Sequence, residues 1–244
     1  MRLRTSAIVL SLLAVPPWVS AAELRVRPEE SVLAVVTHKA GFASGLAHNH
    51  LVVASGYAVE FALDPGSPAA TRFELRARAE DLVVDDPKMQ EEWFPRIREL
   101  GILDEPFGDV SENDRAKIRD SMLGRKQLDA EAFPELSASL ISVRELTPAP
   151  VENAFPHRVT VALEVHGRRV EREMAARYAR EGGNVSVEAF GLFRFSDLGI
   201  KPFSAFLGAV KNQDEFHVYV HVVAADADAD AASVPGPAPS VSAR

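Results

Sequence analysis

The sequence predicts an all-β protein whose short antiparallel strands close into a barrel or pack as a sandwich. Between residues 31 and 223, apolar and polar residues alternate with a period of two in about eight segments, which is typical of strands with one buried face. Turn signals separate the segments, as at 65–68 and 182–184. A long series of strands must hide its edges, and a barrel or a sandwich does so.

The expected strands follow one another with few interruptions. The first, at 31–37, is apolar and rich in β-branched residues, and the second, at 57–64, places Phe61 and Leu63 on one face. Further strands are expected at 72–80, 136–146, 158–165, 170–178, 185–195 and 216–222.

One helix is expected to interrupt the strands after residue 86. Asp86 followed by Pro87 is a favoured pairing for an N-cap and the first helical position. Apolar residues then recur every four positions on one face, namely Met89, Trp93 and Ile97. Pro95 is expected to divide or kink the segment, and Gly101 stands where a helix would end.

A second helix is expected at 112–123, with Ser111 as its cap. We expect both helices to plug or cover one end of the barrel. The acidic pair Asp85-Asp86 lies at the turn before the first helix, where capping explains it.

The first residues resemble a secretory signal. Arg2 and Arg4 precede an apolar run at 7–15, and small residues end at Ala22. We therefore expect a signal peptide at 1–22, one domain at 23–224, a disordered tail at 225–244, and a periplasmic or secreted location. An uncleaved membrane anchor is the alternative, but the apolar run is short for a bilayer span.

The charge balance excludes some partners. The chain has 27 basic and 35 acidic residues, and removal of Arg2 and Arg4 leaves 25 against 35, a net charge of −10 with neutral histidines. Such a surface repels nucleic acid and anionic lipid headgroups. Because the chain has no cysteine, it must rely on an apolar core. After signal cleavage no segment is expected to span a membrane.

Four blocks of residues stand in a fixed order behind this leader. The first holds Ser31, His38, Gly41-Phe42, Gly45, Gly56 and 61–64; the second holds Asp114-Arg115, Met122-Leu123, Leu128-Asp129 and 133–136. The third is Leu-Glu-Val-His-Gly at 163–167, and the fourth is Phe-Ser-Asp-Leu-Gly-Ile at 195–200. Together they resemble the motifs of the YceI-like proteins, over nearly all of the chain between leader and tail.

The resemblance implies a lipocalin-like antiparallel β-barrel of about eight strands that encloses a polyprenyl chain or an isoprenoid quinone. It also implies a periplasmic location and no catalytic residues. Two features depart from the family. Phe195 stands where the family has arginine and Leu198 where it has phenylalanine, and 87–113 is longer than the usual connection. Both lie in regions expected to shape the cavity.

An apolar lining would bind such a ligand by removing hydrocarbon from water. The phenylalanines are the best candidates for the lining: Phe42, Phe61, Phe73, Phe133, Phe193, Phe195, Phe203 and Phe206. The alternative is that these rings fill the barrel and leave no cavity, since barrels of this size are often packed solid. No cofactor is expected beyond the bound isoprenoid, and a homodimer is left open.

Seven histidines suggest a second hypothesis, an exported metal-binding protein that uses His38, His48 and His50. A zinc site needs three or four ligands that converge, and the sequence does not show that these do. The string at 48–50 is no nuclease signature, because those catalytic residues are not adjacent. Glycine-rich phosphate loops, nucleophile elbows and cysteine nucleophiles are missing too, so we expect no enzyme.

Overall fold

The computed structural model describes residues 22–42, 45, 47–63, 67–147, 155–181 and 183–226. The expected signal peptide at 1–22 lies outside the described residues except for Ala22, which begins the first strand. The expected tail at 225–244 also lies outside them, except that the last strand continues through Ala225 to Asp226.

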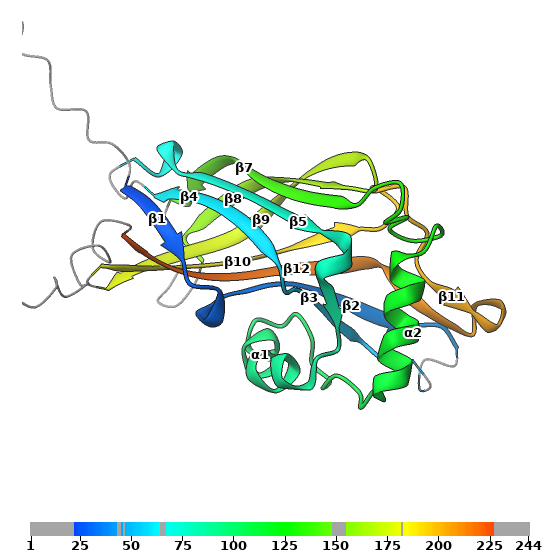
Figure 1. Ribbon diagram of the computed structural model, residues 1–244. Helices are drawn as coiled ribbons and strands as arrows, with labels where there is room; N and C mark the ends of the chain where they lie inside the picture. Colours follow the sequence, from blue (N-terminus) through cyan, green and yellow to red (C-terminus); the bar gives the residue numbers. More distant parts are fainter. Residues whose placement is uncertain are drawn as a thin grey trace, which may run out of the picture.

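Eight antiparallel strands close into a barrel, which confirms the predicted fold class and decides against a sandwich. Figure 1 shows the long strands running between β1 at one end and helix α2 at the other. In ring order they are β1 (Ala22–Val26), β4 (Tyr57–Leu63), β5 (Arg72–Arg78), β7 (Glu135–Glu145), β8 (His157–Val165), β9 (Arg168–Glu181), β10 (Asn184–Arg194) and β12 (Val210–Asp226). Pairing of β1 with β12 closes the ring.

Toward the α2 end, the wall on one side is made by three further strands. β2 (Val32–Ala40) follows β1 after the 3-10 turn η1 (Pro28–Glu30) and pairs with β12. β3 (His50–Ala54) pairs with β2 on one side and with β6 (Leu82–Val84) on the other. Among the strand pairings that the structure describes, β6 has no partner on its outer edge.

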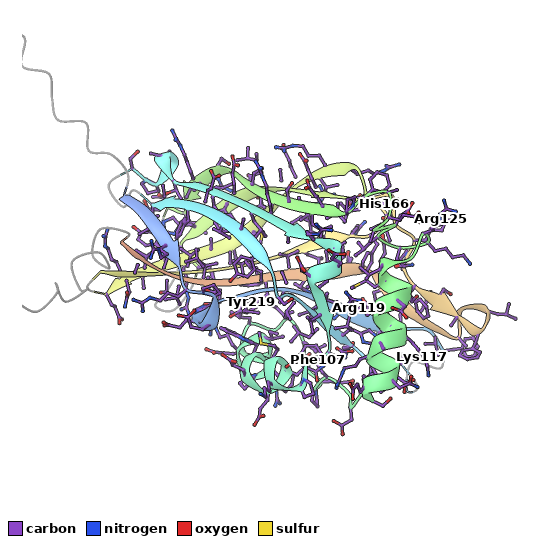
Figure 2. The ribbon with its side chains drawn as sticks, viewed as in Figure 1. Phe107, Lys117, Arg119, Arg125, His166 and Tyr219 are labelled. Carbon is purple, nitrogen blue, oxygen red and sulfur yellow. The ribbon has the colours of Figure 1, made fainter. Side chains whose placement is uncertain are left out.

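Helix α2 (Glu112–Leu123) covers this free edge, at the end where the sequence predicted a helix. Its Arg119 side chain donates to two carbonyl oxygens beside the edge, those of Leu82 at 3.2 Å and Glu80 at 2.5 Å. Figure 2 shows Arg119 between α2 and β6. The expected cap is confirmed, because the hydroxyl of Ser111 accepts from the amide of Asp114 at 3.2 Å.

Helix α1 (Pro87–Glu99) lies against the outside of the barrel wall and does not plug its mouth. Ile97 of α1 packs with Val32, Val36 and Tyr219, which project outward from β2 and β12. Asp86 caps the helix as predicted, but Pro95 lies inside it without dividing it. Side-chain packing on the wall thus outweighs the backbone hydrogen bond that a proline removes.

The apolar sequence of β2 explains this position. Alternate residues such as Leu33 and Val35 face the barrel interior, whereas Val32 and Val36 face α1. A strand that is covered on both faces has no polar side. None of the helices in the described part of the chain is long and apolar enough to cross a bilayer.

The remaining short elements join the strands. They are the 3-10 turns η3 (Pro68–Ala70), η4 (Ala79–Asp81) and η5 (Phe206–Gly208), and the strand β11 (Ser204–Ala205), which pairs with β12. The hairpin between β8 and β9 turns on His166 and Gly167, which both have positive φ, at 54° and 68°. Hairpin turns of two residues favour this backbone.

Candidate ligand-binding cavity

The barrel encloses a cavity of about 500 Å³, a size common for small-molecule sites. Its wall is mostly aliphatic and aromatic and draws on every long strand of the ring from β4 to β12. Several inward-facing side chains stay partly accessible, among them Val161, Leu163, Val218 and Val220. Their free surface faces the void, so side chains do not fill the barrel.

Five of the eight predicted phenylalanines line the cavity: Phe61, Phe73, Phe193, Phe195 and Phe203. Their roles in the wall differ. Phe193 is 1% exposed and its ring stacks on Phe216 with centroids 5.9 Å apart. Phe73 is less buried and meets Phe61 edge to face at 6.0 Å. That these side chains bind a ligand stays a prediction.

The other three predicted phenylalanines lie outside the cavity. Phe42 is 89% exposed, just beyond the end of β2, and Phe206 is 81% exposed in the turn η5, where its φ is 50°. Strand alternation no longer sets the direction of a side chain in such turns. Phe133 packs against the β8–β9 hairpin, with its ring 4.9 Å from that of His166.

The cavity reaches the surface at the α2 end. Its three exposed lining residues are Lys117 and Ser121 on α2 and Phe203 before β11. The ammonium of Lys117 forms an ion pair with Asp114 at 2.9 Å, so it is not a free charge at this opening. The amide of Gln127 donates to the carbonyl of Lys201 at 3.0 Å and joins the two segments that flank the opening.

A histidine and an aspartate form a pair in the cavity wall near this end. The Nδ1 atom of His50 lies 2.7 Å from Oδ2 of Asp85, which is 2% exposed. Oδ1 of Asp85 accepts from the amide of Leu51 at 2.9 Å and from the side chain of Gln90 at 3.0 Å. His50 lines the cavity, and among the described residues its other ring nitrogen, Nε2, has no hydrogen-bond partner.

Sequence reasoning missed this pair because capping seemed to explain both acids. Asp86 is the cap, whereas Asp85 reaches across to β3 with a positive φ of 51°. A signal was present, since a helix needs only one N-cap residue. Asp85 is the acid that the cap does not need, so it was free to have another partner.

Thr37 is the direct cross-strand neighbour of His50 in the pairing of β2 with β3, and it also lines the cavity. It is 6% exposed, and its hydroxyl has no hydrogen-bond partner among the described residues. At the far end of the cavity, the Thr71 hydroxyl and Nδ1 of His157 are also buried, and neither has a hydrogen-bond partner among the described residues. The cavity is therefore apolar along its length, with polar groups toward each end.

The three histidines of the metal hypothesis do not come together. Nε2 of His38 lies 2.9 Å from Nδ1 of His217, which projects outward from β12, while His48 packs against Gly108 and His50 faces the cavity. The described residues contain no group of three or more side chains that could hold a metal ion.

Outside the barrel, a buried charge network fixes α1 to the wall. Glu188 on β10 is 4% exposed and accepts from Arg96 at 2.7 and 2.8 Å, from Arg177 at 2.8 Å and from the Tyr219 hydroxyl at 3.0 Å. Burial by itself raises the pKa of Glu188, but the bonds and charge of Arg96, with Tyr219 and Arg177, outweigh it and lower the pKa. Figure 2 shows Tyr219 on the side of the wall that faces α1.

Comparisons with known proteins show which solved structures have a similar fold. The sequence matches no protein-family model, and no curated protein matches it either. Among solved structures, BcnA of Burkholderia cenocepacia is similar, with a TM-score of 0.54 and 13% identity over 81% of this chain and 98% of BcnA. The chain shares the fold of BcnA. An identity this low establishes the fold alone.

Two further solved structures match less closely. A YCEI protein of Campylobacter jejuni has a TM-score of 0.47 and 10% identity, over 71% of this chain and 83% of that chain. A polyisoprenoid-binding domain of Saccharophagus degradans has a TM-score of 0.48 and 8% identity, over 85% of this chain and 99% of the domain. The structural matches therefore include a YCEI protein, of the family whose motifs this sequence resembles.

Proposed function

We propose that this protein binds a long apolar molecule of the isoprenoid type in its barrel cavity and carries or sequesters it after export. The observation that supports this most directly is the cavity itself, about 500 Å³ with an almost wholly apolar wall. Apolar side chains that face a void leave unfavourable surface that a hydrocarbon chain would cover. The activity proposed is binding, with no chemical step.

The ligand class is proposed from the shape of the site. The cavity follows the strands from Thr71, before the first residue of β5, to α2 beyond β6, which favours an extended chain over a compact ring system. The Saccharophagus domain is described as polyisoprenoid-binding, and the same ligand class is proposed here. The periplasmic or secreted location is also a proposal, which rests on the leader at 1–22.

Two measurements test the proposal. The full chain is expressed with its leader, purified and extracted with organic solvent, and we expect mass spectrometry to find a co-purified apolar lipid. The delipidated protein should then bind the fluorescent probe N-phenyl-1-naphthylamine, and geranylgeraniol should displace it. Failure of both measurements would refute the proposal, and stoichiometric metal in elemental analysis would favour the metal-binding alternative.

A matched pair of variants locates the site. Ala138 on β7 lines the cavity, whereas its neighbour Ser139 does not. Ala138→Trp should fill part of the cavity and weaken probe binding more than tenfold. The reason is that the indole ring takes the apolar area that the probe would otherwise cover. Ser139→Trp places the same ring on the other face of the strand and should leave binding unchanged. Equal effects of the two variants would place the bound probe elsewhere.

A further inference from the structure

The polar pair of Thr37 and His50 is out of place in an apolar wall. As direct partners on β2 and β3, the two residues have Cβ atoms about 5 Å apart. Both side chains line the cavity, near the end where α2 covers the edge of β6. No bond joins Thr37 to His50, since the Thr37 hydroxyl has no partner among the described residues. The hydroxyl itself is buried, and rotation about χ1 of Thr37 would turn it toward the cavity, where one ligand oxygen can contact both side chains.

Asp85 determines what His50 can offer to a ligand. The backbone amide of Leu51 and the side-chain amide of Gln90 both donate to Oδ1, so the carboxylate acts as an acceptor. We therefore assign the imidazole proton to Nδ1, which donates to Oδ2 of Asp85. In the neutral ring Nε2 is then an acceptor. Because Nδ1 is turned to Asp85 and His50 lines the cavity, we place Nε2 on the cavity side of the ring.

The hydroxyl of Thr37 supplies the complementary group. It can donate a hydrogen bond to a ligand oxygen, while Nε2 of His50 accepts one from the ligand. A buried hydroxyl without a partner is costly, and a ligand that pairs with it removes that cost. One donor and one acceptor side by side match a hydroxyl group, which accepts and donates through the same oxygen.

We propose that Thr37 and His50 bind the hydroxyl head of an apolar alcohol, so that the cavity prefers a free prenol or phenol to its ether or its phosphate. This inference rests on the proposed function and names the ligand class within it. A phosphate is disfavoured because the Asp85 carboxylate lies 2.7 Å behind the imidazole, and the Lys117 ammonium already has Asp114 as its partner.

The first test uses the wild-type protein and three probes with the same chain: geranylgeraniol, its methyl ether and its phosphate. Each competes with N-phenyl-1-naphthylamine for the delipidated protein at pH 7.5. We expect geranylgeraniol to bind about tenfold more tightly than the ether, because the ether has no proton for Nε2 of His50. The phosphate should bind more weakly than the alcohol.

The second test compares two identical substitutions at opposite ends of the cavity. Thr37→Val removes the hydroxyl beside His50. Thr71→Val removes a similarly buried hydroxyl from the residue that precedes β5. Thr37→Val should weaken the binding of geranylgeraniol about tenfold, the effect of losing one buried hydrogen bond. Thr71→Val should weaken it less, because Thr71 contacts only the far end of the prenyl chain. Thermal unfolding of both variants checks that they fold.

The third test changes the proton position without touching the cavity surface. In Asp85→Asn the amide nitrogen would face Nδ1 of His50, because the oxygen is needed by the amides of Leu51 and Gln90. The imidazole proton would then move to Nε2, which becomes a donor that the ether can use. The preference for alcohol over ether should fall to less than about twofold in this variant.

The outcomes separate this inference from the proposed function. If none of the three probes binds, the proposed function fails. If all three bind equally, or the phosphate binds best, the cavity binds apolar chains but Thr37 and His50 do not select a hydroxyl. A loss of alcohol binding in Thr71→Val and not in Thr37→Val would place the head group at the other end and would likewise overturn the inference.

Discussion

Arg96 on helix α1 and Glu188 on strand β10 are joined by two hydrogen bonds of 2.7 and 2.8 Å across the outside of the barrel wall. The Glu188 side chain is only 5% exposed, so Glu188→Gln would leave the charge of Arg96 without its buried partner. We expect the free energy of unfolding in urea to fall by about 3 kcal/mol. Glu173→Gln, which breaks an exposed pair with Arg144, should cost less than about 1 kcal/mol.

The same carboxylate predicts a dependence on acid. The pKa of Glu188 is lowered in the folded protein relative to 4.5, the ordinary value. Because the unfolded chain then binds a proton more readily, this stabilisation is present above about pH 4.5 and is lost as the pH falls through the folded pKa. Urea midpoints measured between pH 5 and pH 3 should fall less steeply in Glu188→Gln than in the wild type. Equal slopes would contradict the prediction.

The His38–His217 pair acts in a higher pH range. Burial, and then the charge of His38, lower the pKa of His217 to about 4, and burial lowers that of His38 despite the opposing charge of Glu215. The unfolded histidine binds its proton near pH 6.5, so stability should fall as the pH decreases from 6.5 to 4. His217→Gln should remove part of this loss, less than about 3 kcal/mol because solvent screens a partly exposed imidazole. The readout is the urea midpoint at each pH.

Variants of Phe193 and Phe73 distinguish a side chain that stabilises the barrel wall from one that mainly contacts the cavity. Phe193→Ala should lower the free energy of unfolding by about 3–5 kcal/mol, because the ring is 1% exposed and stacks on Phe216. Phe73→Ala should cost less, since part of its surface already faces the void. Both should weaken the binding of geranylgeraniol. A larger loss of stability in Phe73→Ala would reverse this assignment.

The contacts of Arg119 predict a kinetic effect. Arg119→Met removes the two hydrogen bonds that tie α2 to the carbonyls of Leu82 and Glu80. We expect faster amide exchange in β6 and faster uptake and release of N-phenyl-1-naphthylamine in stopped flow, because opening this edge no longer breaks those bonds. The control is Arg115→Met on the same helix. Among the described residues this side chain donates only to the carbonyl of Val110, so the rates should stay unchanged.

Much of the fold was predictable, because strand alternation and capping are local signals. The caps at Asp86 and Ser111 and most strands of the ring follow from residues near one another in the chain. Closure of the ring does not, because it pairs Leu24 with Asp226. The position of α1 was missed, although the apolar run at the start of β2 indicated cover on both faces of that strand. A periodic helix shows that it has a buried side but not which surface it meets.

The site was predicted in part. Five of the predicted phenylalanines line the cavity, and all but Phe203 lie in segments predicted as strands. The prediction failed for Phe42 and Phe206, which lie in turns. The bond between His50 and Asp85 joins residues 35 positions apart, and only the folded chain brings them together. The hydroxyl of Thr37 became informative only once its surroundings showed no partner for it within the described residues.

The barrel can open more easily beside β6 than elsewhere around its circumference. Elsewhere, neighbouring strands share ladders of backbone hydrogen bonds, and spreading them apart breaks many bonds together. At β6 the neighbour is helix α2, and within the described residues the hydrogen bonds that tie it to this edge come from Arg119. A ligand longer than the cavity could extend between β6 and α2 without separating any paired strands. Under the proposed function, the volume of the cavity therefore sets no upper limit on the length of the ligand.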